Sequence, residues 1–192
     1  MESALPRSVP SPNATLALIA HLFERRLLPS VPFVMDSLFD RLSHAVDDDD
    51  ALKVEDHIWS LWMRHPNRAA ERVLNLATGD IAARRFDIAE TRLVRLLRDC
   101  PRYPEAWHKL ATLHYLLGRD DESLAEYHRS LELEPRHFGA LCAVGEILVA
   151  RGDAEGAMLA FHAALRIHPH HRAARERLTA LTGGSRTLAS GN

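Results

Sequence analysis

Cysteine is scarce in this sequence, and its scarcity argues against two classes of protein. The 192 residues include two cysteines, Cys100 and Cys142, which are too few for the disulfide framework of a small secreted domain. Their separation does not match the paired spacing of a zinc motif either. We therefore expect both thiols to be reduced and partly buried, with Cys142 either a small packing residue or turned toward an inner groove.

Charge of one sign and long apolar runs are also lacking. The formal net charge is −2 at pH 7, and the arginines are scattered, which argues against nucleic acid as a partner. The apolar stretch at residues 16–32 is interrupted by charged residues and is too short to cross a bilayer. It lacks the basic start and the cleavage site of a signal peptide. We expect a cytoplasmic protein; a periplasmic location would require a mis-assigned start codon or signal.

No set of catalytic residues stands out. Serine, cysteine and carboxylate side chains form no nucleophile–base pattern. Residues 168–171 (HPHH) straddle a proline, which favours exposed loop histidines, with fortuitous zinc or nickel binding as the alternative. Residues 47–50 (DDDD) lack the alternating ligands and turn glycine of a calcium loop and favour a capped helix start. We predict no catalytic residue, no cofactor and no metal site.

The sequence does contain an internal repeat of 34 residues. The segment from Trp107 to Pro135 and the segment from Leu141 to Pro169 place large, small and turn residues at matching positions. The pairs that are 34 residues apart are Trp107 and Leu141, Leu110 and Val144, Gly118 and Gly152, Tyr127 and Phe161, and Pro135 and Pro169. A third copy precedes these two, and a degenerate fourth copy ends at Pro66.

Each copy predicts two helices joined by a tight turn. Apolar residues recur three and four positions apart on both sides of a break that contains Gly118 or Gly152. The closing proline separates one pair of helices from the next. Small residues recur where helices must approach closely. They are Ala77, Ala111 and Gly145 on the first helices and Ala89, Ser123 and Ala157 on the second helices.

These positions resemble the tetratricopeptide repeat (TPR) family. The residues that carry the family pattern are Trp107, Leu110, Tyr127 and Pro135 in one copy, and Val144, Gly145, Gly152, Ala157, Phe161, Ala164 and Pro169 in the next. The sequence segments IWSLWMRHPN and EPRHFGAL are also similar to segments of bacterial repeat proteins of unassigned function. The resemblance implies an all-α fold, a right-handed superhelical solenoid of antiparallel helix hairpins.

The period and the resemblance together divide the chain. We expect a disordered N-terminal segment at 1–15, an apolar helix at 16–32, a degenerate repeat at 34–69, full repeats at 70–103, 104–137 and 138–171, a C-terminal capping helix at 172–183 and a disordered tail at 184–192.

Three residues depart from the family pattern. His114 and Asp80 stand where the family usually has tyrosine, and Arg84 stands where the later copies have a turn glycine. A positive φ at Arg84 would cost about 1 kcal/mol relative to glycine. We therefore expect a remodelled turn in the first full copy.

The concave face of a solenoid is made by its first helices, and we expect function there. Steps of three and four residues place one stripe on each first helix. The predicted peptide-binding groove comprises Glu71, Leu74 and Thr78, then Glu105, His108, Lys109, Thr112 and Tyr115, and finally Cys142, Glu146 and Val149. Its three carboxylates favour a neutral or basic ligand. The basic clamp with which some family members hold a terminal carboxylate is lacking.

We therefore predict a non-enzymatic interaction scaffold or adaptor that binds a peptide segment or partner helix of another protein in this groove. The partner's identity is open. One alternative is a self-associating structural protein, for example a homodimer through the solenoid ends or the N-terminal helix. A third class, a histidine-rich metal-binding protein or an enzyme, has the least support.

Overall fold

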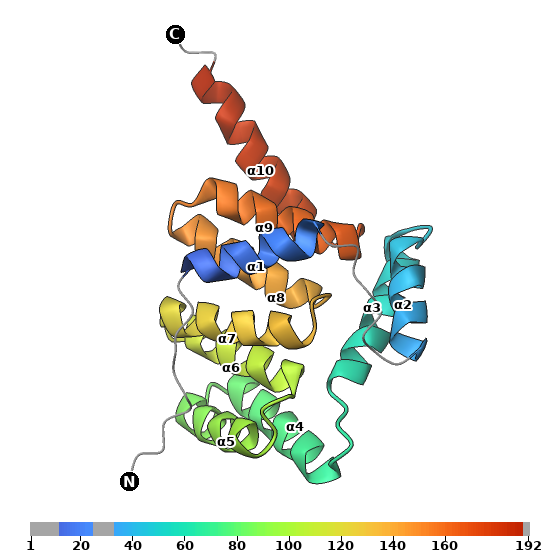
Figure 1. Cartoon of the computed structure of the whole chain (residues 1–192), viewed down its shortest axis with the longest axis vertical. Coiled ribbons are helices and arrows are strands. Elements are labelled where there is room, and N and C mark those ends of the chain that lie inside the picture. The colour runs from blue at the N-terminus through green and yellow to red at the C-terminus, as the bar shows by residue number, and fades with distance from the viewer. Residues whose placement is uncertain (1–11, 25–32, 190–192) are drawn as a thin grey trace. The chain divides into compact units, whose positions relative to one another are not determined.

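The computed structural model describes residues 12–24 and 33–189, and all regular structure within them is helical (Figure 1). The described helices are α1 (Pro12–Glu24), α2 (Phe33–Ser43), α3 (Asp48–Trp62), α4 (Arg68–Ala82), α5 (Phe86–Asp99), α6 (Pro104–Leu116), α7 (Asp120–Leu133), α8 (Phe138–Ala150), α9 (Ala154–Ile167) and α10 (Arg172–Ala189). The predicted all-α fold class is confirmed. None of these helices is both long enough and apolar enough to cross a membrane.

The chain ends differ in detail from the sequence-based boundaries. The predicted disordered segment at 1–15 lies mostly outside the described residues, but α1 already begins at Pro12. Residues 25–32, the second half of the predicted apolar helix, are also outside them. At the other end, α10 continues past residue 183 to Ala189, and residues 190–192 are outside the described part.

The chain divides into two compact units. The first is built mainly from Trp59–Pro135, and the second from Ile19–Ile58 and Arg136–Asn192. The division falls within α3 and between α7 and α8. Some of the predicted repeats therefore lie in the first unit and others in the second.

The first unit consists of two helix hairpins, α4–α5 and α6–α7, whose helices pack against one another. The predicted small residues lie at these contacts, because Ala77, Ala89, Ala111 and Ser123 have no exposed surface. The Ser123 hydroxyl donates a hydrogen bond of 2.8 Å to the carbonyl oxygen of Ala111. This bond joins α7 directly to the backbone of α6, so a larger side chain at position 123 would separate the helices.

One pair of equivalent positions, one on each helix of a hairpin, changes its chemistry from repeat to repeat. On the first helices it is occupied by Asp80, His114 and Leu148, and twelve residues later on the second helices by Arg92, Glu126 and Ala160. In the first repeat, Arg92 Nε lies 2.8 Å from Asp80 Oδ2. In the second, His114 Nδ1 lies 2.8 Å from Glu126 Oε2. The first two repeats thus use ion pairs of opposite polarity, and the third uses two apolar residues.

The turn between α4 and α5 keeps the geometry of the later turns. Arg84 has a φ of 58°, close to the 70° of Gly118 and the 76° of Gly152. The next residue in the first turn, Arg85, donates its N–H to Asp80 O at 2.8 Å, and the later turns repeat this bond at 2.9 Å. The expected remodelled turn is therefore wrong, because Arg84 itself adopts the left-handed conformation. The left-handed conformation costs about 1 kcal/mol at this position.

The second unit contains the α8–α9 hairpin, α10 packed against α9, and α2 in contact with α9. The hairpin closes most tightly at Gly145. A Cβ atom added there would lie 2.7 Å from two carbon atoms of the Phe161 ring. Phe161 is 1% exposed, so its ring has little freedom to move away.

We predict that Gly145→Ala destabilises the second unit by about 1 to 3 kcal/mol, because the overlap with Phe161 outweighs the better helix propensity of alanine. Gly79→Ala is the matched control, since Gly79 also lies inside a first helix but an added Cβ would meet nothing within 4 Å. That change is expected to stabilise α4 by about 0.5 to 1 kcal/mol. Urea unfolding of both variants measures the difference; equal effects of the two substitutions would contradict the prediction.

Side chains cap several helices, as the sequence indicates. Asp47 Oδ1 accepts the backbone N–H of Asp50 at 2.8 Å, which confirms the DDDD run as a capped helix start. His137 and His171 are one period apart and each accepts, through Nδ1, the N–H three residues later at 3.2 Å. The helix α10 therefore begins in the same way as the first helix of the preceding repeat.

Candidate functional site

The α6 stripe of the predicted groove lies in the first unit and contains a buried charge. Glu105 is completely buried, and its Oε1 lies 2.8 Å from Lys109 Nζ and 3.6 Å from His108 Nδ1. His108 is 8% exposed. The carboxylate charge is therefore compensated within α6. It does not face an incoming ligand, which removes one of the reasons for expecting a neutral or basic partner.

An aromatic side chain of the same chain already contacts this stripe. The Trp59 ring lies 5.6 Å from the His108 ring, and Lys109 Nζ stands 5.4 Å from the Trp59 centroid, within the range of a cation–π contact. Trp62 meets Trp59 edge-on at 5.0 Å. The end of α3 thus places an indole on the α6 stripe.

The remaining α6 residues extend the stripe toward the end of the helix. The Thr112 hydroxyl donates to His108 O at 2.9 Å and lies 3.1 Å from the Tyr127 hydroxyl. Tyr115 is 40% exposed. The stripe therefore passes from a buried charged end to an exposed aromatic ring.

The α4 stripe is only partly where the sequence predicted it. Leu74 has no exposed surface and belongs to the apolar core of the first unit, so its assignment to the groove is wrong. Glu71 is half-buried, and its Oε2 accepts the backbone N–H of His65 at 3.3 Å. Thr78 donates its hydroxyl to Leu74 O at 2.9 Å. This helix offers fewer accessible groups than expected.

The α8 stripe lies in the second unit and is covered by α10. Arg177 holds both carboxylate oxygens of Glu146 at 2.7 Å. Cys142 Sγ lies 3.7 Å from His171 Nδ1, and burial raises the pKa of this thiol to about 12, so it is an unreactive packing group at neutral pH. Val149 is half-buried. The sequence had left open whether Cys142 faces the groove or packs, and the structure places it in packing.

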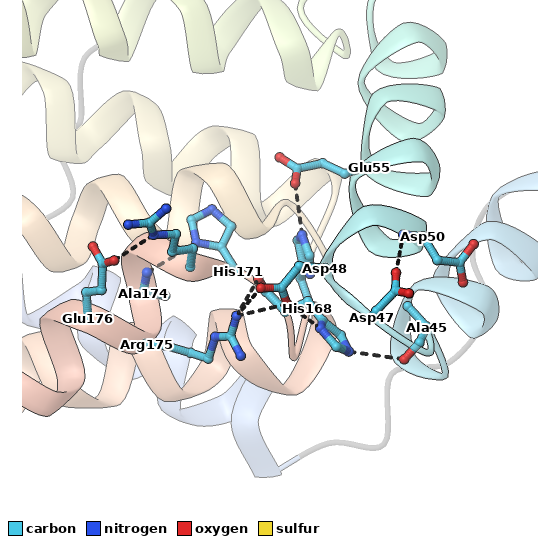
Figure 2. Close-up of polar contacts among 12 residues, drawn as sticks. Ala45, Asp47, Asp48, Asp50, Glu55, His168, His171, Ala174, Arg175 and Glu176 are labelled. Atoms are coloured by element: carbon cyan, nitrogen blue, oxygen red, sulfur yellow. Dashed lines mark hydrogen bonds and ion pairs between the residues drawn. The ribbon is translucent and has the colours of Figure 1, made fainter.

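A second polar cluster, in the second unit, was not predicted. Figure 2 shows carboxylates of α3 directed at the segment between α9 and α10. His168 Nε2 lies 2.9 Å from Glu55 Oε2, and His170 Nδ1 lies 2.7 Å from Asp48 Oδ1. Arg175 is 3.0 Å from the same Asp48 oxygen. His170 and then Arg175 hold the pKa of Asp48 below its usual value, against a smaller opposing effect of burial.

The interpretation of the HPHH segment as exposed loop histidines is therefore wrong for its first member. His168 is 1% exposed, because it ends α9 and turns inward beside Phe138, with ring centroids 5.2 Å apart. The oppositely charged runs DDDD and HPHH were both visible in the sequence. Nothing in a 34-residue period pairs residues that are 122 positions apart, as His170 and Asp48 are.

Comparisons with known proteins agree with the repeat pattern. Tetratricopeptide repeat family models match residues 104–137 and 121–172. A TPR repeat-containing protein of Rhizobium etli is 30% identical over 156 residues, which cover 80% of this chain and 76% of that protein.

Solved structures of low sequence identity share the fold. The Yersinia enterocolitica type III secretion chaperone SycD, solved in complex with a peptide of the translocator YopD, matches 62% of this chain and 96% of its own with a TM-score of 0.59 and 13% identity. The Sgt2 TPR domain of Aspergillus fumigatus matches 66% of this chain and 85% of its own with a TM-score of 0.59 and 14% identity.

Proposed function

The chain belongs to the tetratricopeptide repeat family, and from this membership we propose that it is a non-enzymatic scaffold that binds a segment of a partner protein on the α6 stripe. Repeats of this family are protein-interaction modules whose first helices present a continuous face. The solved SycD complex is a relative in fold that holds a peptide.

The single observation that carries the proposal is the indole of Trp59 on His108 and Lys109. A surface that holds one aromatic side chain by ring contact and cation–π attraction has the chemistry to hold another. The exposed ring of Tyr115, further along the same helix, extends the surface available to a ligand. We therefore expect the bound segment to present an aromatic anchor beside apolar residues.

Site-specific photo-cross-linking tests this assignment better than substitution of the buried residues. Glu105→Arg would place an uncompensated charge in the interior and unfold α6. A photoreactive phenylalanine analogue at Tyr115, 40% exposed, is compared with the same analogue at Ile88, which is 46% exposed on the second helix α5. The two positions are matched in exposure and differ in the helix that carries them.

We expect a discrete cross-linked species from position 115, enriched at least several-fold over position 88, with the attached peptide identified by mass spectrometry. A peptide from another protein supports the scaffold, whereas a peptide from this chain itself supports the self-associating alternative. Equal yields from both positions would refute the α6 stripe as the binding surface.

A further inference from the structure

The second unit contains a further candidate interaction surface. Its groups are Arg136, before α8, His168 and His170, between α9 and α10, and Arg175 on α10; we call these four residues the basic clasp. The clasp contacts the pair of helices α2 and α3, and it does so through charge.

Four acid–base pairs described across this contact run in one direction. The clasp residues Arg136, His168, His170 and Arg175 bind Asp36 at 2.7 Å, Glu55 at 2.9 Å, Asp48 at 2.7 Å and Asp48 at 3.0 Å, respectively. In each pair the α2–α3 segment provides the acid and the repeat provides the base. Such one-sided complementarity is how an interface selects a partner of opposite charge.

The acids of α3 have the spacing of a helical recognition motif. Asp48 and Glu55 are seven residues apart, two helical turns, so they project from the same side of α3. Apolar residues accompany them, since Ala51, Val54 and Ile58 are at most 2% exposed. Arg136 also lies over the Phe39 ring of α2, 4.2 Å from its centroid. An acidic helix with an apolar stripe is therefore the ligand type that fits the clasp.

The contact is weaker than the packing inside the repeat. At one end of the contact the Asp48 side chain is 67% exposed and that of Arg175 is 44% exposed, and this ion pair contributes little because water screens it. The side chains of His168 and Arg136, at 2% and 12% exposed, are largely buried. The helix α2 touches α9 over a short stretch, whereas α8 packs along α9. The α2–α3 segment can therefore be released without dismantling the α8–α9 hairpin.

We propose that the basic clasp is a binding surface for an acidic amphipathic helix of a partner protein, that α2 and α3 are its resident occupant, and that a partner helix with carboxylates seven residues apart displaces them. The clasp recognises its ligand by charge, whereas the α6 stripe takes an aromatic anchor. The two binding proposals can therefore be supported or refuted independently.

The probe is a synthetic peptide of residues 45–58, AVDDDDALKVEDHI, labelled with fluorescein. It contains the two clasp-binding acids of α3 and stops before Trp59, so it cannot use the α6 contact. A side-chain lactam between Asp49 and Lys53, which form an exposed pair in α3, pre-organises the helix.

Fluorescence anisotropy compares the peptide's affinity for four full-length proteins. In the wild type the resident helix competes. Asp48→Asn with Glu55→Gln weakens the resident helix and leaves the clasp intact. Asp49→Asn with Asp56→Asn is the matched control, because it removes the same charge from exposed positions of α3. The fourth protein adds His170→Gln and Arg175→Gln to the Asp48→Asn, Glu55→Gln chain.

We expect the Asp48→Asn, Glu55→Gln protein to bind the peptide at least tenfold more tightly than the wild type and the matched control. Adding His170→Gln and Arg175→Gln should abolish that gain. Equal affinity for the first three proteins, no binding to any of them, or binding that survives loss of the two bases would each overturn the proposal. Helicity by circular dichroism verifies that all four proteins are folded.

Discussion

Replacing His114 by alanine is expected to lower the free energy of unfolding of the first unit by about 3 to 5 kcal/mol, because it leaves a buried carboxylate without its partner. His114 is 5% exposed and Glu126 12% exposed at the side chain. Both ring nitrogens face carboxylates, Nδ1 toward Glu126 at 2.8 Å and Nε2 toward Glu90 at 3.2 Å. Ionised carboxylates only accept hydrogen bonds, so with both glutamates ionised the doubly protonated imidazolium satisfies both contacts. Urea unfolding measures the loss.

The chain itself supplies the control for this substitution. The equivalent pair in the next repeat is Leu148 and Ala160, which are both buried. The double variant His114→Leu with Glu126→Ala copies that pair, and we expect it to recover most of the stability because no charge is left unpaired. Glu90 keeps a partner in this variant, since Arg119 lies 3.1 Å away. A double variant as unstable as His114→Ala would mean that the helix packing, and not the ion pair, is responsible.

The same pair makes the stability of the first unit dependent on pH. Burial opposes protonation of His114, but the hydrogen bonds and charges of Glu126 and Glu90 outweigh it and raise the pKa. Burial also raises the pKa of Glu126. A raised folded-state pKa gives stability that is complete below the unfolded pKa of about 6.5 for histidine and is lost as the pH rises through the folded value. Stability should therefore fall as the pH rises above about 6.5 in the wild type, and it should change less in the His114→Leu, Glu126→Ala variant.

Replacing Phe161 by alanine is expected to cost about 3 to 5 kcal/mol, the range for removing a buried aromatic ring. The ring is 1% exposed and packs directly on the backbone of α8, because Gly145 has no side chain to intervene. Gly145 cannot fill the space that the ring leaves, so a cavity results. Hydrogen exchange of the α8 and α9 amides, together with urea unfolding, reports where stability is lost.

Size compensation tests the specificity of that contact. Phe161→Leu makes room for a methyl group at position 145, so Gly145→Ala should cost less in the Phe161→Leu background than in the wild type. Additive costs would show that the two residues do not share a contact. A loss below about 1 kcal/mol for Phe161→Ala would show that the site collapses around the missing ring.

The repeat period was sufficient to predict the hairpins because each helix of a solenoid packs mainly on its neighbours in sequence. The turn glycines, the small residues at helix contacts and the closing prolines are local signals with fixed spacing. The turn of the first full repeat was the exception, because Arg84 adopts a positive φ close to that of Gly118, whereas the cost of that conformation for arginine had favoured a remodelled turn.

The candidate sites were less predictable, because burial depends on more than periodicity. A helical stripe three and four residues apart was expected to be accessible, but the same step placed Leu74, Glu105 and His108 in buried positions. The buried His168 is hydrogen-bonded to Glu55, 113 residues away. Contacts of that separation leave no trace in a single sequence, and only the structure brings them together.

The alternating ion pairs of the first two repeats have a consequence for how the chain assembles. Neighbouring units of similar sequence are prone to exchange partners while they fold. If α4 paired with α7 in place of α5, Asp80 would meet Glu126 and not Arg92, and if α6 paired with α5 in the same manner, His114 would meet Arg92. Both errors place like charges together at largely or partly buried positions, which is unfavourable. In the first two repeats, this pair of contacting residues therefore favours the native helix pairing over exchange of helices between repeats.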